Sequence, residues 1–285
     1  MTASAQPAVK LHFIEKGAGQ PIVLVPGWSQ SARFYQKQID GLSDRYRVIA
    51  VDMRGHGDSP KPKSGYRIAR LAQDLHEFLV DQNLDNVVLG GHSMGSSILW
   101  SYCEQFGRDR VSKLMFIDQA PMVTNGSGEA GDGSGLTGQA LKETGAAFTP
   151  AVLWATANAV AAAQGAVVDG FKPAFFSASI PDADVAFNKA ETMKMPAAYA
   201  SRLLIDHCSQ DWRDVIQHVI PGLGVPVLVF GGALGTIFPP EAAEWIAKQI
   251  PGSTLSVFTA EERGSHFMFW ENPEKFNAVV RAFVG

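Results

Sequence analysis

The chain has 285 residues, 46% of them hydrophobic, which is enough to bury a large core as one domain with an inserted element. Its formal net charge is −4 and its lysines and arginines do not cluster, so a nucleic-acid-binding surface is not expected. The N-terminus lacks an apolar signal core, and no stretch approaches the roughly 20 apolar residues of a spanning helix, so we expect a cytoplasmic protein without membrane contact.

The first third of the chain predicts strands that alternate with a helix. Leu11 to Glu15 alternates apolar and polar residues like a short opening strand. The runs 21–25 and 47–52 are almost continuously apolar, which is typical of parallel strands buried on both faces. Between residues 66 and 83 the apolar residues recur at helical spacing, so this segment is expected to pack on the sheet as a helix.

A glycine-containing loop follows each of these two buried strands. Pro26, Gly27 and Trp28 come after the first strand, and glycine at position 27 allows the backbone to come close to a bound molecule. The second strand leads into Arg54-Gly55-His56-Gly57. We expect this segment to be a hydrogen-bonded turn in which His56 has a structural role.

The segment 87–106 changes abruptly from strand spacing to helix spacing, and Ser93 lies at the change. Ser93 stands between Gly91 and Gly95 in the pattern Gly-x-Ser-x-Gly. Because these glycines have no Cβ, the strand and the helix can approach each other, and the serine hydroxyl is expected at the top of the sheet. The Met94 N–H would then lie at the helix start, where free backbone donors can bind an oxyanion.

After a further predicted strand at 111–117, which ends at Asp118, the regular alternation stops. The segment 126–135 has the glycine-rich composition of a mobile loop, and 149–164, 183–195 and 196–208 are predicted helices. A buried-strand pattern returns only at 225–230. Because the gap is too long for a plain connection, we expect residues 122–222 to form a helical cap over a core of residues 1–121 and 223–285.

The last part of the chain predicts a helix at 239–250, a strand at 253–258, a loop that contains His266, and a final helix. Strands that alternate with helices predict an α/β fold with a mostly parallel, three-layer sheet. A serine hydroxyl needs a base within hydrogen-bond reach, and that base needs an orienting carboxylate. Of the seven histidines, His266 alone follows the last predicted strand, in a short loop before an aromatic run.

These motifs resemble the α/β-hydrolase superfamily, in its serine-nucleophile branch of haloperoxidases, arylesterases and lactonases, over most of the chain except the cap. The resemblance implies that Ser93 is the nucleophile and His266 its base, because relatives place the base in this loop. It also implies an oxyanion hole formed by the Trp28 and Met94 N–H groups, although Pro26 stands where relatives usually carry a histidine. Ser93 is incompatible with the aspartate chemistry of dehalogenases and epoxide hydrolases of this fold.

The acid of the triad is less direct to assign. Most relatives carry an aspartate after the strand that corresponds to 227–230, but this chain has Gly235 there and no carboxylate before Glu241. Some branches place the acid after the preceding core strand, which is the position of Asp118. We therefore expect Asp118 to orient His266, with a purely structural Asp118 as the alternative. Glu261 and Glu262 are expected to be solvated.

The substrate is expected to be an apolar small molecule with an uncharged ester or lactone group, and neither a metal nor a cofactor is expected. No Lys/Arg clamp for an acid or phosphate is evident. Apolar residues of the cap and the catalytic loops are candidates for the pocket wall, with a role in the core as the alternative. They are Met122, Trp154, Phe171, Phe175, Phe176, Met193, Met195, Phe267 and Met268.

Two other functions are compatible with the same motifs. The loops around Trp28 and His56 and the place of Asp118 are also similar to those of cofactor-free dioxygenases that act on hydroxyquinolones, in which a His/Asp pair would deprotonate the substrate. A hormone-receptor-like binding module on this fold would retain the triad but signal through the cap. The name haloperoxidase describes a perhydrolysis side reaction of such sites.

Overall fold

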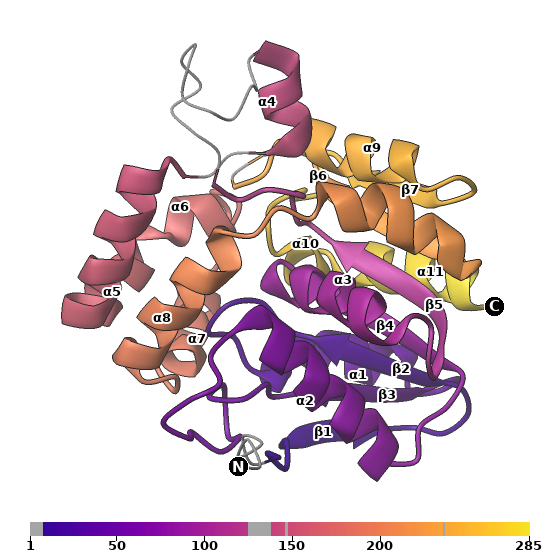
Figure 1. Cartoon of the computed structure of the whole chain (residues 1–285). Helices are drawn as coiled ribbons and strands as arrows, with labels where there is room; N and C mark the ends of the chain where they lie inside the picture. The colour runs from indigo at the N-terminus through magenta and orange to yellow at the C-terminus, as the bar shows by residue number, and fades with distance from the viewer. Residues whose placement is uncertain (1–7, 125–137, 146–147, 236) are drawn as a thin grey trace.

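The computed structural model describes residues 8–124, 138–145, 148–235 and 237–285, and these form a sheet with helices on both faces (Figure 1). The sheet has seven strands in the order β1-β3-β2-β4-β5-β6-β7. Only β1 is antiparallel to its neighbour, and it begins at Phe13 rather than at Leu11. The predicted fold class is therefore confirmed. The strands are β1 (Phe13–Lys16), β2 (Pro21–Val25), β3 (Arg47–Val51), β4 (Val87–His92), β5 (Val111–Ile117), β6 (Val227–Gly232) and β7 (Thr254–Phe258).

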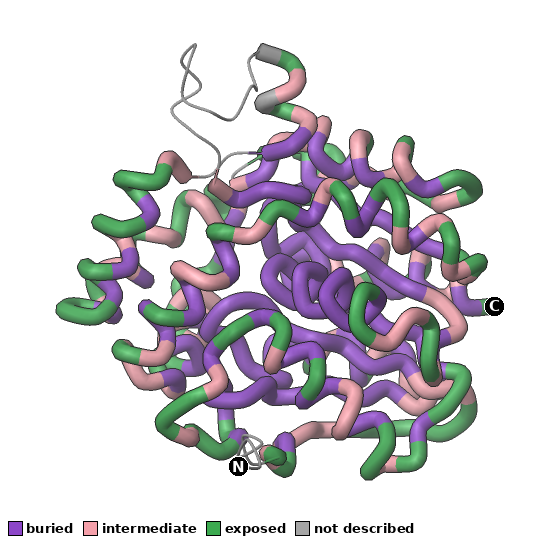
Figure 2. The backbone as a smooth tube through the Cα atoms, in the orientation of Figure 1, coloured by how far each residue is buried: buried purple, intermediate pink, exposed green. Residues whose placement is uncertain are grey.

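The two faces of the sheet carry separate hydrophobic clusters, because side chains alternate along each strand. In β2, Val23 and Val25 belong to one cluster, whereas Ile22 and Leu24 belong to the other. The first face is covered by α2 (Ile68–Asp81), α3 (Met94–Phe106) and α9 (Pro240–Gln249), and the second by α1 (Gln36–Leu42) and α11 (Pro273–Val284). Figure 2 shows the central strands and α3 as the buried interior.

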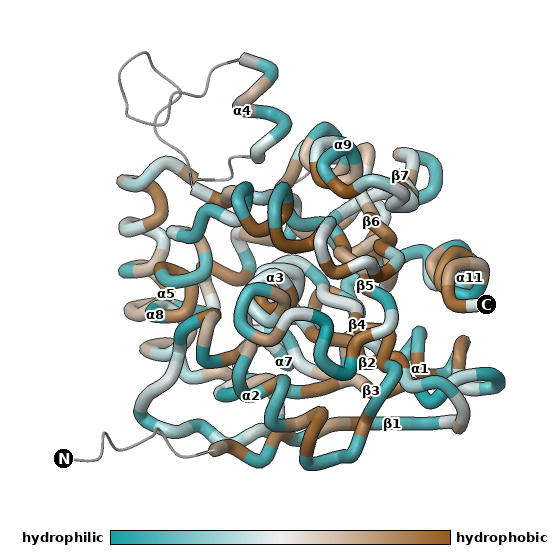
Figure 3. The backbone as a smooth tube through the Cα atoms, turned by 45° about the vertical axis from the view of Figure 1, so that its right-hand side comes forward, coloured by the Kyte–Doolittle hydropathy of each residue, from teal (hydrophilic) through white to brown (hydrophobic). Residues whose placement is uncertain are grey.

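Burial on both faces explains why the inner strands are hydrophobic along their whole length. All residues of β4 and β6 are buried, so no strand position there faces water. In Figure 3 the hydrophobic segments accordingly run along the strands, and hydrophilic segments lie on outer turns and loops.

Among the described residues, five α-helices lie between β5 and β6 and form the cap, on one side of the sheet in Figure 1. They are α4 (Gly138–Thr144), α5 (Pro150–Gly170), α6 (Lys172–Phe175), α7 (Asp182–Thr192) and α8 (Ala197–Cys208). Helix α5 packs against α6, α7 and α8, whereas α4 packs against α9 of the core. Residues 125–137, which include the whole of the predicted glycine-rich loop 126–135, lie outside the described residues.

Short helical segments complete the chain. They are η1 (Ala32–Tyr35) after β2, η2 (Val215–Val219) and η3 (Ile220–Leu223) before β6, and α10 (Met268–Glu271) before α11. The segment η2 packs on α3 and α9, so the chain has already returned to the core before residue 222. Both cysteines, Cys103 and Cys208, are buried and free.

Helix α5 differs from the expectation that no segment could span a membrane. The helix has 21 residues, and an 18-residue window within it has a mean hydropathy of 1.4, so it could span a membrane by length and composition, with 28% of that window buried. Many of these residues are alanine or valine, which raise hydropathy without forming a conspicuous apolar run. The helix packs along α8 and buries Leu153, Ala157 and Val160, as a helix of a folded domain does. A cytoplasmic location stays a prediction.

Candidate active site

Ser93 occupies a strained turn between β4 and α3. Its φ of 52° and ψ of −123° lie in a region that non-glycine residues rarely adopt. The two flanking glycines make the turn possible. A Cβ on Gly91 would stand 2.4 Å from the carbonyl carbon of Gly95, and a Cβ on Gly95 would stand 2.3 Å from the Val25 oxygen. Strand and helix therefore meet closely, and Ser93 stands at the tip of the turn, facing a pocket.

Two loops at the same end of the sheet bring Asp118 and His266 together. Asp118 directly follows β5 with a φ of 45°, and its N–H donates to the Phe230 oxygen of β6. His266 lies in the loop between β7 and α10. The His266 Nδ1 is 2.6 Å from Asp118 Oδ2, and both side chains are buried. The structure thus places the predicted acid beside the predicted base.

Burial controls the protonation of this pair. Loss of solvation lowers the pKa of His266 to about 3, so its imidazole is neutral at pH 7. With the Nδ1 hydrogen donated to Asp118, the lone pair is on Nε2. Burial also raises the pKa of Asp118. The backbone N–H of Gly232 donates to this carboxyl group, and this hydrogen bond lowers the pKa and so opposes the effect of burial. The imidazole is therefore in the form that can accept a proton.

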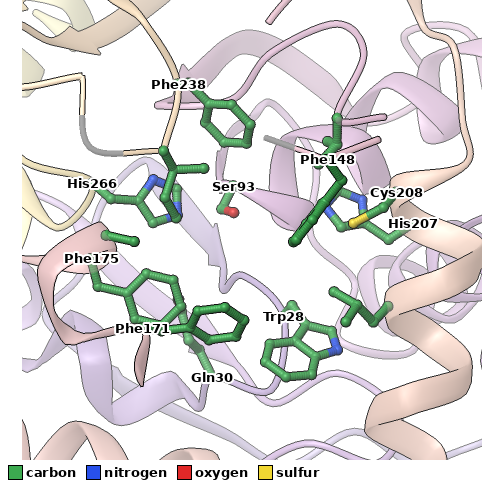
Figure 4. Close-up of a pocket in the computed structure, with 14 residues that line it drawn as sticks. Trp28, Gln30, Ser93, Phe148, Phe171, Phe175, His207, Cys208, Phe238 and His266 are labelled. Carbon is green, nitrogen blue, oxygen red and sulfur yellow. The ribbon is translucent and has the colours of Figure 1, made fainter. Parts of the chain in front are cut away.

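Ser93 and His266 line the same pocket, but no hydrogen bond joins them. Within the described ranges the Ser93 hydroxyl has no hydrogen-bond partner, and it points into the open space beside the imidazole in Figure 4. Nucleophile and base often lie apart in ligand-free sites and approach when substrate binds. The geometry is therefore compatible with proton transfer from Ser93 to His266.

The two expected oxyanion donors come from the loop after β2 and from the start of α3. Met94 is the first residue of α3, where a backbone N–H has no acceptor within the helix. The loop that contains Trp28 is fixed at both ends. The Gly27 N–H donates to Gln30 Oε1 over 3.0 Å, and the Trp28 indole N–H donates to the Ala200 oxygen of α8 over 2.8 Å. The loop is thus attached to the cap as well as to the core.

A pocket of about 330 Å³ lies between the sheet end and the cap (Figure 4). Aromatic and aliphatic side chains form most of its wall, and the polar exceptions are Gln30, Ser93, His207 and His266. None of the described lining residues is Lys, Arg, Asp or Glu. The described lining residues are Trp28, Gln30, Ser93, Val123, Phe148, Phe171, Ala174, Phe175, Leu204, His207, Cys208, Ile237, Phe238 and His266.

Phe171 and Phe175 are the two residues of the expected apolar wall that do line this pocket. Trp154 of α5 and Met193, directly after α7, differ most from the expectation, because their exposed fractions are 56% and 42%. Phe176 and Phe267 stack on each other with their ring centroids 4.7 Å apart, behind the wall rather than in it. The remaining three, Met122, Met195 and Met268, are buried outside the lining.

Several lining residues were not expected, and His207 is the most informative of them. It is a buried residue at the end of α8, and it faces the pocket beside Cys208. Gln30 and Phe238 come from core loops whose side-chain directions no periodicity indicates. The one feature of the sequence that could have indicated His207 as a pocket residue is that it is a histidine in a predicted cap helix with no structural role to explain it.

The other candidate acids lie away from His266. Glu241 begins α9 and approaches Lys142 of α4 at 3.8 Å. Glu262 forms an ion pair with Lys275, and Glu261 is exposed. None of the three lines the pocket, which leaves Asp118 as the carboxylate in contact with the imidazole.

Among the described residues, one group could hold a metal ion by geometry. The ligand atoms of His12, Asp52 and Asp58 lie within 4.8 Å of one another. The Asp52 carboxylate already accepts hydrogen bonds from the Ala32 N–H at 2.6 Å, the Asp58 N–H at 2.9 Å and His12 Nδ1 at 2.7 Å. These hydrogen bonds give the three residues a structural role, because they hold the turn after β3 in place. His56 lies in the same turn. Its Nδ1 is hydrogen-bonded to the Arg54 oxygen at 3.0 Å, which agrees with the structural role expected for it.

Comparison with known proteins gives consistent matches along the chain. A family profile described as the alpha/beta hydrolase fold matches residues 20–273. A Synechocystis sp. protein assigned by name to the non-heme chloroperoxidases is 28% identical over 283 residues, which cover 97% of this chain and 95% of that protein.

Solved structures add two neighbours of different activity. An esterase from Exiguobacterium antarcticum superposes with a TM-score of 0.84 at 28% identity, covering 97% of this chain and 96% of the esterase. The enol-lactonase from Burkholderia xenovorans gives a TM-score of 0.78 at 22% identity, covering 97% of this chain and 96% of the lactonase. At 22% identity the second likeness is one of fold.

Proposed function

The chain belongs to the alpha/beta hydrolase fold family, and we propose that it is a serine hydrolase that cleaves a carboxylic ester or a lactone of an apolar small molecule. The observation that carries the proposal is the meeting of Ser93, on a strained turn, with the hydrogen-bonded pair of His266 and Asp118 at one pocket. His266 is neutral at pH 7 and lines the same pocket as the unpaired Ser93 hydroxyl, and this combination supports nucleophilic catalysis.

In the first half of the reaction, His266 Nε2 takes the proton from Ser93, and the serine oxygen attacks the carbonyl carbon. The imidazolium that forms is stabilised by Asp118, which holds Nδ1 at 2.6 Å. The backbone N–H groups of Met94 and Trp28 are assigned to the developing oxyanion. Removal of one such donor typically costs about 2.7–4 kcal/mol in the barrier.

The imidazolium then protonates the leaving alcohol, and the tetrahedral intermediate collapses to an acyl-enzyme on Ser93. A water molecule activated by His266 attacks the acyl-enzyme and releases the acid. With a lactone the alcohol and the acid belong to one molecule, so the product is a single hydroxy acid. Both substrates therefore use the same residues.

The pocket wall supports an uncharged, largely apolar substrate. Aromatic rings from both the core and the cap surround it, among them Trp28, Phe171 and Phe238. No described lining residue carries a formal charge at pH 7, given that burial keeps His207 and His266 neutral. A cavity of about 330 Å³ lies at the small end of the usual ligand-pocket range of roughly 300–1,000 Å³.

A panel of esters and lactones of graded size tests this proposal, together with a fluorophosphonate probe and mass spectrometry. We expect hydrolysis of uncharged esters, a probe adduct on Ser93, and a loss of orders of magnitude in kcat for Ser93→Ala. An adduct on another residue, or undiminished hydrolysis by Ser93→Ala, would contradict the proposal.

The buried His266–Asp118 pair also supports a second candidate function, that of a cofactor-free dioxygenase. In that reaction the pair would deprotonate a hydroxyquinolone, and Ser93 would be dispensable for the base step. Oxygen uptake with such a substrate measures it directly. Uptake that persists in Ser93→Ala and disappears in His266→Ala would favour the dioxygenase over the hydrolase.

A further inference from the structure

His207 is a polar side chain in the pocket that the proposed reaction does not use. It lies near the end of α8, it is 4% exposed, and it lines the cavity with Leu204 and Cys208 of the same helix. Figure 4 shows it on the opposite side of the cavity from His266, with Ser93 between the two. A substrate that reaches Ser93 therefore has its far part beside the His207 ring.

The imidazole of His207 lacks the hydrogen bonds that the other buried histidines have. Its Nδ1 is enclosed by protein and unpaired, and its Nε2, which is not enclosed, bonds none of the described residues either, so Nε2 is the nitrogen that a ligand could reach. In contrast, His92 bonds Gln30 and the His266 oxygen, and His56 bonds the Arg54 oxygen. Buried polar groups are normally paired, so an unpaired one at a cavity wall points to a partner that arrives with a ligand.

The protonation of His207 limits what that partner can be. Burial and the neighbouring His266 lower the pKa of His207 to about 3, so the ring is neutral at pH 7. A neutral imidazole has one donor and one acceptor, and no protein contact fixes which nitrogen has the hydrogen. It therefore suits an uncharged group that can both donate and accept, whereas a carboxylate would remain without a counter-charge.

A hydroxyl group has both of these properties and fits a wall that is otherwise apolar. We propose that His207 is a specificity-determining residue that hydrogen-bonds a hydroxyl group on the part of the substrate remote from the scissile carbonyl. The substrate class is then an ester or lactone with an apolar body and one hydroxyl. This inference rests on the proposed hydrolase function for its kinetic test, but its binding test does not.

The test uses matched esters of a size suited to the cavity. They are the methyl 3-phenylpropanoates with a hydroxyl group at the 2-, 3- or 4-position of the ring, each compared with the ester that has a methyl group there. Hydroxyl and methyl groups are similar in size, so the ratio of the two kcat/KM values reports the hydrogen bond. We expect at least one position at which the hydroxyl ester is preferred tenfold or more.

Variants of His207 assign the preference to its imidazole. His207→Phe keeps a ring but removes both nitrogens, and should reduce the ratio to below twofold. His207→Gln keeps a donor and an acceptor, and should retain part of the ratio. His218→Phe changes an exposed histidine outside the pocket and should leave the ratio as it is in the wild type. A wall residue with only a packing role would change both esters of a pair equally.

Binding to Ser93→Ala separates this inference from the proposed function. The same six esters are titrated calorimetrically into Ser93→Ala and into Ser93→Ala/His207→Phe. Tighter binding of a hydroxyl ester that depends on His207, without hydrolysis by the wild type, would overturn the hydrolase but support the inference. No preference for any hydroxyl ester, in rate or in binding, or a preference that survives His207→Phe, would overturn the inference.

Discussion

Asp118 Oδ2 lies 2.6 Å from His266 Nδ1, although 148 residues separate them in the chain. The contact depends on the sheet, because the loops after β5 and β7 leave the sheet at the same edge, on either side of β6. The backbone N–H of Gly232, at the end of β6, donates to the same carboxyl group. The last residue of β6 thus supplies a peptide donor to the carboxyl group that follows β5.

Asp118→Asn tests whether this carboxylate orients the base. The amide keeps the shape but can turn its NH₂ group toward Nδ1, which favours the wrong imidazole tautomer and removes the charge that stabilises the imidazolium. We expect kcat for an activated ester to fall by about 10²–10⁴-fold, with a smaller change in KM. Asp182→Asn, at an exposed site on α7, is the control. A normal rate for Asp118→Asn would assign the orienting role elsewhere.

The turn at Ser93 should not tolerate a methyl group on its second glycine. In Gly95→Ala the new Cβ would meet the Val25 oxygen at 2.3 Å and the Pro26 oxygen at 3.1 Å, and both are backbone atoms that cannot turn aside. We expect a loss of about 1–3 kcal/mol in the free energy of unfolding in urea, and a lower kcat, because the turn must open. Gly170→Ala, where a Cβ meets nothing within 4 Å, should change neither value greatly.

The residues of the turn show how much of the site the sequence could predict. A strand that becomes a helix at Gly-x-Ser-x-Gly has few conformations, so Ser93, Gly91 and Gly95 were predictable from local sterics. The sheet order then determined where the loops of Asp118 and His266 would lie, since parallel strands present their carboxyl ends to one edge. The local pattern accounts for Ser93, whereas the choice of His266 and Asp118 among the other histidines and carboxylates depended on the resemblance to the α/β-hydrolase superfamily.

The pocket wall could not be predicted in the same way, because it depends on how the cap helices are rotated. In α5 almost every face is apolar, so composition does not show which residues turn inward, and Trp154 is exposed although it is aromatic. His207 falls in the predicted cap helix 196–208, whose sequence does not show that the packing of α8 against α5 turns this side chain toward the cavity. Such rotations are decided by contacts distant in sequence.

Buried neutral histidines should make the protein less stable in mild acid. Burial lowers the pKa of His56 to about 4 and that of His207 to about 3, whereas in the unfolded chain each has a pKa of about 6.5. Between these values the unfolded chain binds more protons than the folded one, so acid favours unfolding. The contribution of these two histidines to the free energy of unfolding is fully present above their pKa in the unfolded chain, and it declines as the pH falls toward their pKa in the folded protein.

Urea unfolding at a series of pH values from 8 to 5 measures this effect. Each of the two histidines contributes a slope of up to about 1.4 kcal/mol per pH unit below pH 6.5. His207→Gln should show a shallower decline than the wild type, and replacement of the exposed His218 by Gln should not. Stability that stays constant from pH 7.5 to pH 5 would show that these imidazoles are protonated in the folded protein.

An acyl-enzyme on Ser93 should also react with hydrogen peroxide. Peroxide that attacks in place of water would release a peracid, and the peracid would oxidise bromide to hypobromous acid. On the proposed mechanism, we expect bromination of monochlorodimedone by the wild type in acetate with peroxide and bromide. Ser93→Ala and omission of acetate should each abolish it, and bromination without a carboxylic acid would require a different mechanism.

Glu191 connects the cap to the loop that contains Trp28. Its buried carboxylate on α7 accepts from Ser31 Oγ at 2.7 Å, and it pairs with Arg33 at 3.2 Å and Lys194 at 3.0 Å. Removal of the carboxylate leaves two cations and a hydroxyl without their shared partner beneath the cap. We therefore expect Glu191→Ala to be less stable to urea and to raise KM more than it lowers kcat.

The double-mutant cycle of Glu191→Ala with Ser31→Ala isolates the contact between cap and core. The two side chains share a hydrogen bond, so their effects on the free energy of unfolding should couple by about 0.5–3 kcal/mol. Glu244→Ala, on the exposed face of α9, paired with Ser31→Ala should be additive. Additivity in the Glu191 cycle as well would mean that this hydrogen bond does not hold α7 on the core, and that the cap is kept in place by its apolar contacts, such as those of Trp28 and Phe171.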